Sequence, residues 1–156
     1  MVLRFLMDTQ PAELQVIMAA HISFFDHTAD MGIRITATSR EELVAGAIDG
    51  LYRAIGRLEG RGHSRDISFE FSSDDDAGLL RDLLAEILFL FEKSQEILLA
   101  PVEVKFADGR LSVTAKVVAI DAARSEFQHE VKAITYHELT MRPTAGGWEA
   151  SIIVDI

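Results

Sequence analysis

The chain has 156 residues, of which 49% are hydrophobic, and its formal net charge is −10 because 25 acidic residues outnumber 15 basic ones. This length suits one domain with a sizeable core, and the acidic balance argues against a protein that grips phosphate backbones with clustered lysine and arginine. The absence of cysteine excludes disulfides, thiolate catalysis and thiolate zinc sites, and it suits a cytoplasmic protein.

Residues 1–21 read as an N-terminal extension, flexible or carrying a short helix from Pro11 to Ala20, and residues 22–156 as a single domain. Met18 could equally be the biological start. Acidic residues and Pro11 interrupt the apolar run that a secretory signal needs. No uninterrupted stretch of about 18 apolar residues could span a bilayer, so we expect no membrane association.

A strand and a helix open the domain. Ile33 and Ile35 alternate with polar residues, which is typical of a half-buried strand. Ser39 and Glu42 then form a capping box, the signature of a helix start, and apolar residues follow at helical spacing up to Ile55.

A second strand and a second helix follow. The alternation over residues 67–71 predicts the strand, and a continuous apolar face over residues 79–91 predicts the helix, capped by Ser73 or Asp74. The acidic run at residues 74–76 suits a helix start, where the dipole favours negative charge. It lacks the spaced oxygen ligands and the loop glycine of an EF-hand.

The remaining chain is rich in strand patterns. Residues 102–106 and 111–117 alternate on either side of Asp108-Gly109, the expected pair for a two-residue hairpin turn. Within residues 130–141 the apolar residues shift from even-numbered to odd-numbered positions. We therefore expect a strand with a break near His137 and Glu138. The elements predict an α+β fold in the order strand, helix, strand, helix, strands, with two helices on one face of a largely antiparallel or mixed sheet.

The terminal strand ends with two carboxylates, the side chain of Asp155 and the main-chain carboxylate of Ile156. Alternation places Asp155 on the face opposite Ile152 and Val154. If the first and last strands lie side by side, Asp30 would join these two groups around one cation. Such an all-oxygen set suits Ca²⁺, Mg²⁺ or Mn²⁺, and without a cation its members would repel one another.

Each of these polar residues also has a structural interpretation. The stretch at residues 26–30 can be a turn in which Asp30 bonds backbone amides and His27 packs on a neighbouring strand. Lys132 can be a solvated lysine, while Tyr136 and His137 can be half-buried residues with polar tips. The chain has neither a Gly-x-Ser-x-Gly elbow nor a glycine-rich phosphate loop.

Three motifs in this order resemble the archease family over about residues 24–156. The motifs occupy residues 25–33, residues 129–137, and the terminal strand with its Trp148-Glu149-Ala150 and Val154-Asp155-Ile156 segments. The extension before Ile22 is longer than is usual in the family.

The resemblance implies an accessory protein of tRNA splicing and RNA repair, and not an enzyme. Archeases promote guanylylation and multiple turnover of an RtcB-type RNA ligase, so this chain would meet RNA only through that partner. The resemblance assigns Asp30, Asp155 and Ile156 as the metal ligands and Lys132 as a further functional residue. Ca²⁺ is the ion that we expect in a crystal, with Mg²⁺ and Mn²⁺ as alternatives.

Two other functions fit the same residues. The carboxylates could hold Mg²⁺ for a stand-alone hydrolase that cleaves phosphate esters. A chaperone or an RNA-binding adaptor is the third candidate, although the charge of −10 speaks against direct RNA binding.

Overall fold

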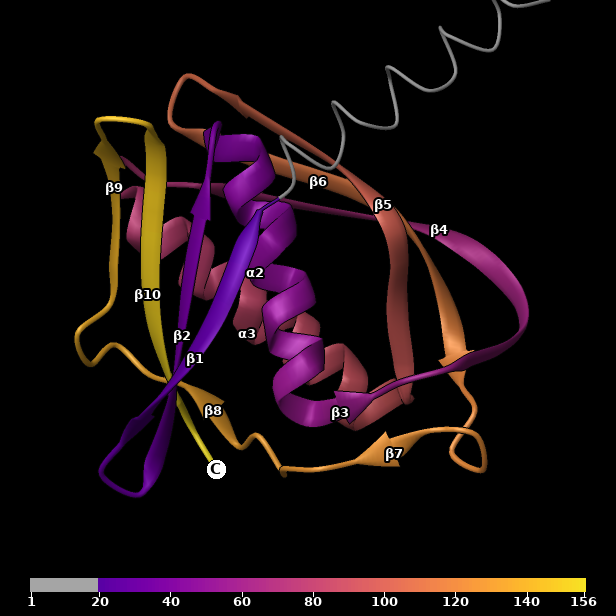
Figure 1. Ribbon diagram of the computed structural model, residues 1–156. Helices are drawn as coiled ribbons and strands as arrows, with labels where there is room; N and C mark the ends of the chain where they lie inside the picture. Colours follow the sequence, from indigo (N-terminus) through magenta and orange to yellow (C-terminus); the bar gives the residue numbers. More distant parts are fainter. Residues whose placement is uncertain (1–19) are drawn as a thin grey trace, which may run out of the picture.

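Two helices lie between two antiparallel sheets in the computed structural model, which describes residues 20–156 (Figure 1). The larger sheet has the order β1 (His21–His27), β2 (Asp30–Ala37), β10 (Gly147–Asp155) and β8 (Ala133–Ile134), and β9 (Thr140–Thr144) also pairs with β10. The smaller sheet has the order β4 (Gly60–Ser72), β6 (Arg110–Ile120) and β5 (Glu96–Ala107). Strands β3 (Gly56–Arg57) and β7 (Glu126–Phe127) form a separate pair.

The helices α2 (Arg40–Ile55) and α3 (Asp76–Ser94) fill the space between these sheets. Helix α2 contacts β1, β2 and β10 of the larger sheet and β5 of the smaller one, and α3 contacts β8, β9, β4 and β5. The α+β class with two helices is confirmed. The helices do not cover one face of a single sheet, however, because buried residues occupy a wide arc of α2 that one sheet could not cover.

The inner face of the larger sheet is apolar. Ile33 of β2 lies opposite Ile152 of β10, and Ile35 lies opposite Ala150. All four are fully buried beneath the helices. This alternation fixes the register of β2 against β10, because a slip of one residue would turn the buried side chains out to solvent.

The starts of the two helices differ from one another. The Ser39 hydroxyl accepts a hydrogen bond from the Glu42 amide (3.1 Å), as predicted for α2. Asp75 is the N-cap of helix α3, one residue after Asp74 and two after Ser73, so the prediction of Ser73 or Asp74 in that role is wrong. The Ser73 hydroxyl instead accepts a hydrogen bond from the Asp75 amide in the preceding turn (3.1 Å).

Two features predicted for the β-rich half are confirmed, a hairpin turn and a break in a strand. Asp108 and Gly109 join β5 to β6 with positive φ angles of 54° and 71°, as a tight hairpin turn requires. Strand pairing stops after the short strand β8, and a turn containing His137 and Glu138 follows. Pairing resumes at Thr140. Glu138 has a left-handed backbone with a φ angle of 50°.

Strand β1 was not predicted from the sequence pattern. Its burial does not alternate cleanly, because it is an edge strand and Phe24 remains 42% exposed. It begins at His21, and Ala20 before it lies against Gly46 of α2. The helix predicted from Pro11 lies, apart from Ala20, outside the described residues, and the domain boundary stays a prediction. Within residues 20–156, no helix is both long and apolar enough to cross a membrane.

Candidate metal centre

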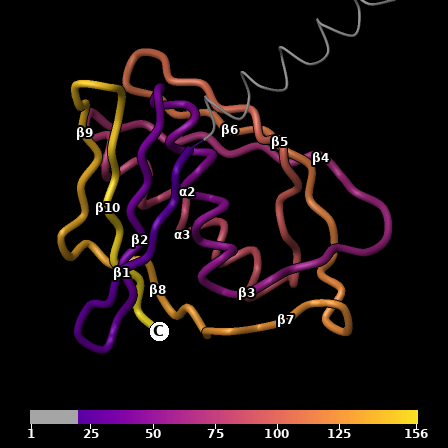
Figure 2. Tube along the Cα trace, in the orientation of Figure 1, coloured from indigo at the N-terminus to yellow at the C-terminus, as the bar shows by residue number. Residues whose placement is uncertain are grey.

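One row of side chains on the outer face of the larger sheet contains the predicted metal ligands. His27 at the end of β1 lies opposite Asp30 at the start of β2, and Asp30 lies opposite Asp155 at the end of β10. Residues directly opposite each other in an antiparallel pair point to the same face of the sheet. The row therefore places both carboxylates side by side on the face that the helices leave uncovered. Figure 2 shows the two strands that carry them, β2 and β10, running side by side.

A tight turn brings His27 and Asp30 together. Thr28 and Ala29 alone separate β1 from β2, and Ala29 adopts a positive φ angle of 62°. The sequence pattern had placed residues 26–30 in a polar stretch before the strand, with a turn as one interpretation. In the structure Thr28 and Ala29 form the turn, and the residues on either side belong to β1 and β2. The strand that carries Asp30 does lie beside the terminal strand, but it is the second strand of the described chain, and not the first.

An apolar row lies next to the carboxylate row. Phe25, Gly32 and Ile153 are opposite one another on the same outer face. The Phe25 ring lies over Gly32, where a Cβ atom would overlap it, and Ile153 is fully buried. The Arg34 guanidinium lies 4.9 Å from the centre of the Phe25 ring. Apolar neighbours exclude water and so strengthen electrostatic interactions at the adjoining carboxylates.

Two like charges directly opposite each other on neighbouring strands are destabilising unless a positive group compensates them. Asp155 is half-buried and the Asp30 side chain is 28% exposed, so water reaches the pair from one side. A divalent cation with oxygen ligands would neutralise the repulsion and accept water in its remaining positions. The residues present therefore fit the predicted cation, and its binding stays a prediction.

The other predicted residues lie beside this pair. The Lys132 amide donates a hydrogen bond to the Asp155 carbonyl (2.7 Å), which holds the exposed Lys132 next to the end of β10. Thr135 donates to the Ile153 carbonyl through both its amide (3.1 Å) and its hydroxyl (2.8 Å). The side chain of Ile156 packs against the core, on the same face as Ile152 and Val154. The role of its main-chain carboxylate as a metal ligand stays a prediction.

Three further residues, His27, His137 and Glu138, meet beside this pair, and the sequence had offered a packing interpretation for the two histidines. His27 Nε2 lies 3.2 Å from the Glu138 carboxylate, and the rings of His27 and His137 are in edge-to-face contact with centres 5.1 Å apart. His27 is more than 100 positions away from His137 and Glu138 in the sequence. The predicted break near His137 and Glu138 was the only signal that this segment leaves the strand.

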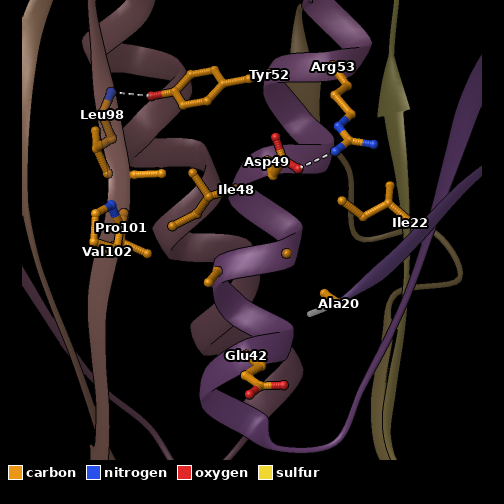
Figure 3. A pocket seen from close by; sticks show the side chains of 13 residues that line it. Ala20, Ile22, Glu42, Ile48, Asp49, Tyr52, Arg53, Leu98, Pro101 and Val102 are labelled. Atoms are coloured by element: carbon orange, nitrogen blue, oxygen red, sulfur yellow. Dashed lines mark hydrogen bonds and ion pairs between the residues drawn. The ribbon is translucent and has the colours of Figure 1, made fainter. Parts of the chain in front are cut away.

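A separate groove of about 610 Å³ lies between α2 and β5 (Figure 3). Its walls are largely apolar, and Asp49 at its edge already pairs with Arg53 (2.8 Å). The Tyr52 hydroxyl accepts a hydrogen bond from the Leu98 amide (2.8 Å). Burial raises the pKa of Tyr52 to about 12, and this hydrogen bond lowers it only in part. The groove shares no lining residue with the carboxylate row.

The chain is similar to a known protein family and to several known proteins. The model of the Archease protein family (MTH1598/TM1083) matches residues 23–156. The chain belongs to the archease family. Protein archease of Methanosarcina barkeri is 32% identical over 85% of this chain and 94% of its own length. The archease of Methanopyrus kandleri is also 32% identical, over 84% of this chain and 96% of its own length.

Solved structures show the same archease fold. Protein 1598 of Methanobacterium thermoautotrophicum superposes with a TM-score of 0.66 at 25% identity and covers 86% of this chain and 98% of its own. A Thermotoga maritima protein described as an archease and possible chaperone superposes with a TM-score of 0.62 at 20% identity, over 85% of this chain and 94% of its own. The similarity to the Thermotoga maritima protein concerns the fold alone.

Proposed function

We propose that this archease is an accessory protein that activates an RtcB-type RNA ligase in tRNA splicing and RNA repair. It promotes guanylylation and multiple turnover of the ligase, does not catalyse the ligation itself, and meets RNA only through its partner. A divalent cation held by Asp30, Asp155 and the main-chain carboxylate of Ile156 is required for this role. The observation that carries the proposal is the register that sets Asp30 and Asp155 opposite each other.

The chemistry of this edge supports docking to a ligase. The chain carries a net charge of −10, which suits an encounter with a basic active site that binds nucleotide triphosphate and manganese. The bound cation would supply a Lewis acid that polarises phosphoryl oxygens. Lys132 lies beside Asp155, where its ammonium group is free to contact a phosphate or the ligase. The cation and Lys132 together would place the nucleotide against the nucleophilic histidine of the ligase.

The deciding experiment adds the purified chain to a cognate RtcB-type ligase with GTP and Mn²⁺ and follows ligase guanylylation and RNA joining. We expect the wild type to raise guanylylation and to permit repeated turnover. Asp30→Ala, Asp155→Ala and a chain extended by a few residues beyond Ile156 should each lose at least about tenfold of this stimulation, as is typical when the residues around a metal are altered. Lys132→Ala should weaken stimulation without releasing the metal.

Asp26→Ala is the matched control. Asp26 is an exposed carboxylate of the same hairpin, but it alternates to the face opposite His27. The Asp26→Ala variant should therefore stimulate the ligase as strongly as the wild type does. Full stimulation by all three altered chains would exclude the carboxylate site, and absence of stimulation by the wild type would exclude the ligase partner.

Two further assays separate the other functions. A stand-alone hydrolase would release phosphate from phosphate esters without any ligase, and Asp155→Ala would abolish that release. An RNA-binding adaptor would retain RNA on a filter with an affinity that falls steeply with salt. We expect neither result.

A further inference from the structure

Three side chains at one end of the larger sheet converge as metal ligands do. Within residues 20–156, His27, His137 and Glu138 form the group of histidine and carboxylate side chains whose ligand atoms all lie within 4.8 Å of one another. Glu138 is central to it, with its carboxylate 3.2 Å from His27 Nε2 and 3.9 Å from His137 Nε2. The three residues come from the end of β1 and from the turn between β8 and β9.

These spacings match those around a tetrahedral zinc ion. Zinc bonds to histidine nitrogen and to carboxylate oxygen at about 2.0–2.2 Å, so neighbouring ligand atoms of a tetrahedral site lie about 3.3 Å apart. The observed separations of 3.2 and 3.9 Å require only small movements of exposed side chains. His137 and Glu138 are 61% and 59% exposed, so they are free to make them.

The environment of His27 supports the same assignment. Within the described part of the chain, His27 Nδ1 is buried without a hydrogen-bond partner, and the nearest carboxylate oxygen, that of Asp30, is 3.8 Å away. A histidine that binds metal through Nε2 carries its proton on Nδ1 and usually directs it to a carboxylate. A small rotation of Asp30 would complete this arrangement. An ordinary buried histidine would leave the cost of the unpaired nitrogen unexplained.

The backbone at Glu138 is a second independent indication. Its φ angle of 50° places a residue other than glycine in the left-handed region, which is sparsely populated and is found more often at functional sites. This conformation ends the turn that brings His137 and Glu138 against His27. The Thr135 hydroxyl accepts a hydrogen bond from the His137 amide (3.2 Å) and so fixes the start of the same turn.

We propose that His27, His137 and Glu138 form a second metal site, selective for a divalent cation of the zinc class. Two imidazoles and one carboxylate are ligands that zinc prefers, whereas calcium and magnesium prefer oxygen alone. Three protein ligands leave the fourth position open to water or to an anion from solution. Asp30 acts on this site as a positioning residue through His27, and as a member of the carboxylate pair it therefore connects that pair to the zinc site.

Titration of the full chain with Co²⁺, followed by displacement with Zn²⁺, tests the proposal without any ligase. We expect one Co²⁺ per chain to develop the visible absorption of a tetrahedral site, and Zn²⁺ to remove it. His137→Ala and Glu138→Gln should each weaken binding at least about tenfold, and Asp30→Asn about 10-fold to 100-fold through the orientation of His27. Circular dichroism would verify that each variant is folded.

Two controls separate this site from other histidines and from the carboxylate pair. His63→Ala removes an exposed histidine of β4 in the other sheet and should bind Co²⁺ like the wild type. Asp155→Asn removes a carboxylate that the zinc site does not use and should also keep the absorption. Absence of the band in the wild type, full affinity in His137→Ala and Glu138→Gln, or loss of the band in Asp155→Asn would each overturn the proposal.

Discussion

At the scale of single residues, the pairing of Asp30 with Asp155 places two negative charges in direct opposition. Opposed like charges destabilise a strand pair by about 0.2–1 kcal/mol, and a bound cation converts the same pair into a source of stability. The sign of their effect therefore depends on the metal content of the solution.

Asp155→Asn tests this dependence. We expect the variant to melt slightly above the wild type in a chelating buffer, and well below it in millimolar Ca²⁺, because only the wild type gains stability from the cation. Differential scanning calorimetry with and without Ca²⁺ measures both effects. Asp26→Asn should follow the wild type in both buffers, and equal responses to Ca²⁺ in wild type and Asp155→Asn would contradict the carboxylate site.

Tyr52 gives the fold a dependence on alkaline pH. Burial raises its pKa from 10.0 to about 12, so the folded state holds the phenol proton more tightly than the unfolded chain does. Its contribution, about 3 kcal/mol, is complete below pH 10 and is lost as the pH rises through about 12.

Tyr52→Phe should remove this dependence. The variant is expected to lose about 1–3 kcal/mol near pH 8, because the buried Leu98 amide loses its acceptor. Its stability should then fall less steeply than that of the wild type between pH 10 and 12. Urea unfolding at several pH values compares the two curves, and parallel curves would show that Tyr52 is not responsible.

At the scale of elements, the start of β10 depends on one glycine. Gly147 has a φ angle of 149°, and a Cβ atom there would overlap the carbonyl oxygen of Ala37 in β2. A backbone oxygen held in a sheet cannot move aside as a flexible side chain can. The close approach of β10 to β2 therefore requires a residue without a side chain at this position.

Gly147→Ala and Gly146→Ala form a matched pair. A Cβ atom at Gly146 meets nothing within 4 Å, and the residue has no positive φ angle. We expect Gly147→Ala to lower the free energy of unfolding by about 2–4 kcal/mol, through clash and backbone strain, and Gly146→Ala to change it by less than about 0.5 kcal/mol. Chemical unfolding measures both, and similar losses in the two variants would refute the close approach.

Local chemistry determined which elements the sequence could reveal. The Asp108-Gly109 turn needs two positive φ angles, and the Ser39 cap needs one hydroxyl beside one amide. Few residue types meet either requirement, so the local sequence predicts both features. The Thr28-Ala29 turn places a positive φ angle on alanine, which no turn rule favours. The sequence consequently offered a turn at residues 26–30 but did not predict strand β1 or its pairing with β2.

At the scale of the whole molecule, both sheets depend on the same two helices. Helix α2 contacts β2 and β10 on one side and β5 on the other, and one buried cluster of side chains includes residues of all these elements. Neither sheet could keep its apolar face covered if the helices were released. We therefore expect the described domain to unfold in a single transition, as small domains usually do.

The single tryptophan allows a test of this cooperativity. Trp148 lies on β10 and reports on the larger sheet, while far-ultraviolet circular dichroism reports on all elements. Their urea unfolding curves should coincide in midpoint and slope. Leu80→Ala, which truncates a fully buried residue of α3, should shift both curves together by about 2–5 kcal/mol. Curves that separate in either protein would indicate independent units.

The candidate sites differ in how far sequence could predict them. Alternation placed Asp155 outside the core, and the resemblance to archeases paired it with Asp30, which the register of β2 and β10 now brings opposite. His27 and Glu138 meet only because the chain returns to the same edge after passing through both sheets. No local pattern encodes such a contact, and only the folded topology brings these residues together.

The position of β10 inside the larger sheet also has a consequence for synthesis. Residues 147–155 are made more than 100 positions after β2, yet they form the strand that separates β2 from β8 and β9. A growing chain must therefore hold β2 with one unpaired edge until β10 leaves the ribosome, and exposed edges invite aggregation. Asp30 and Asp155 become neighbours only once that gap is closed, so a cation that needs both carboxylates could bind there only after β10 has joined the sheet.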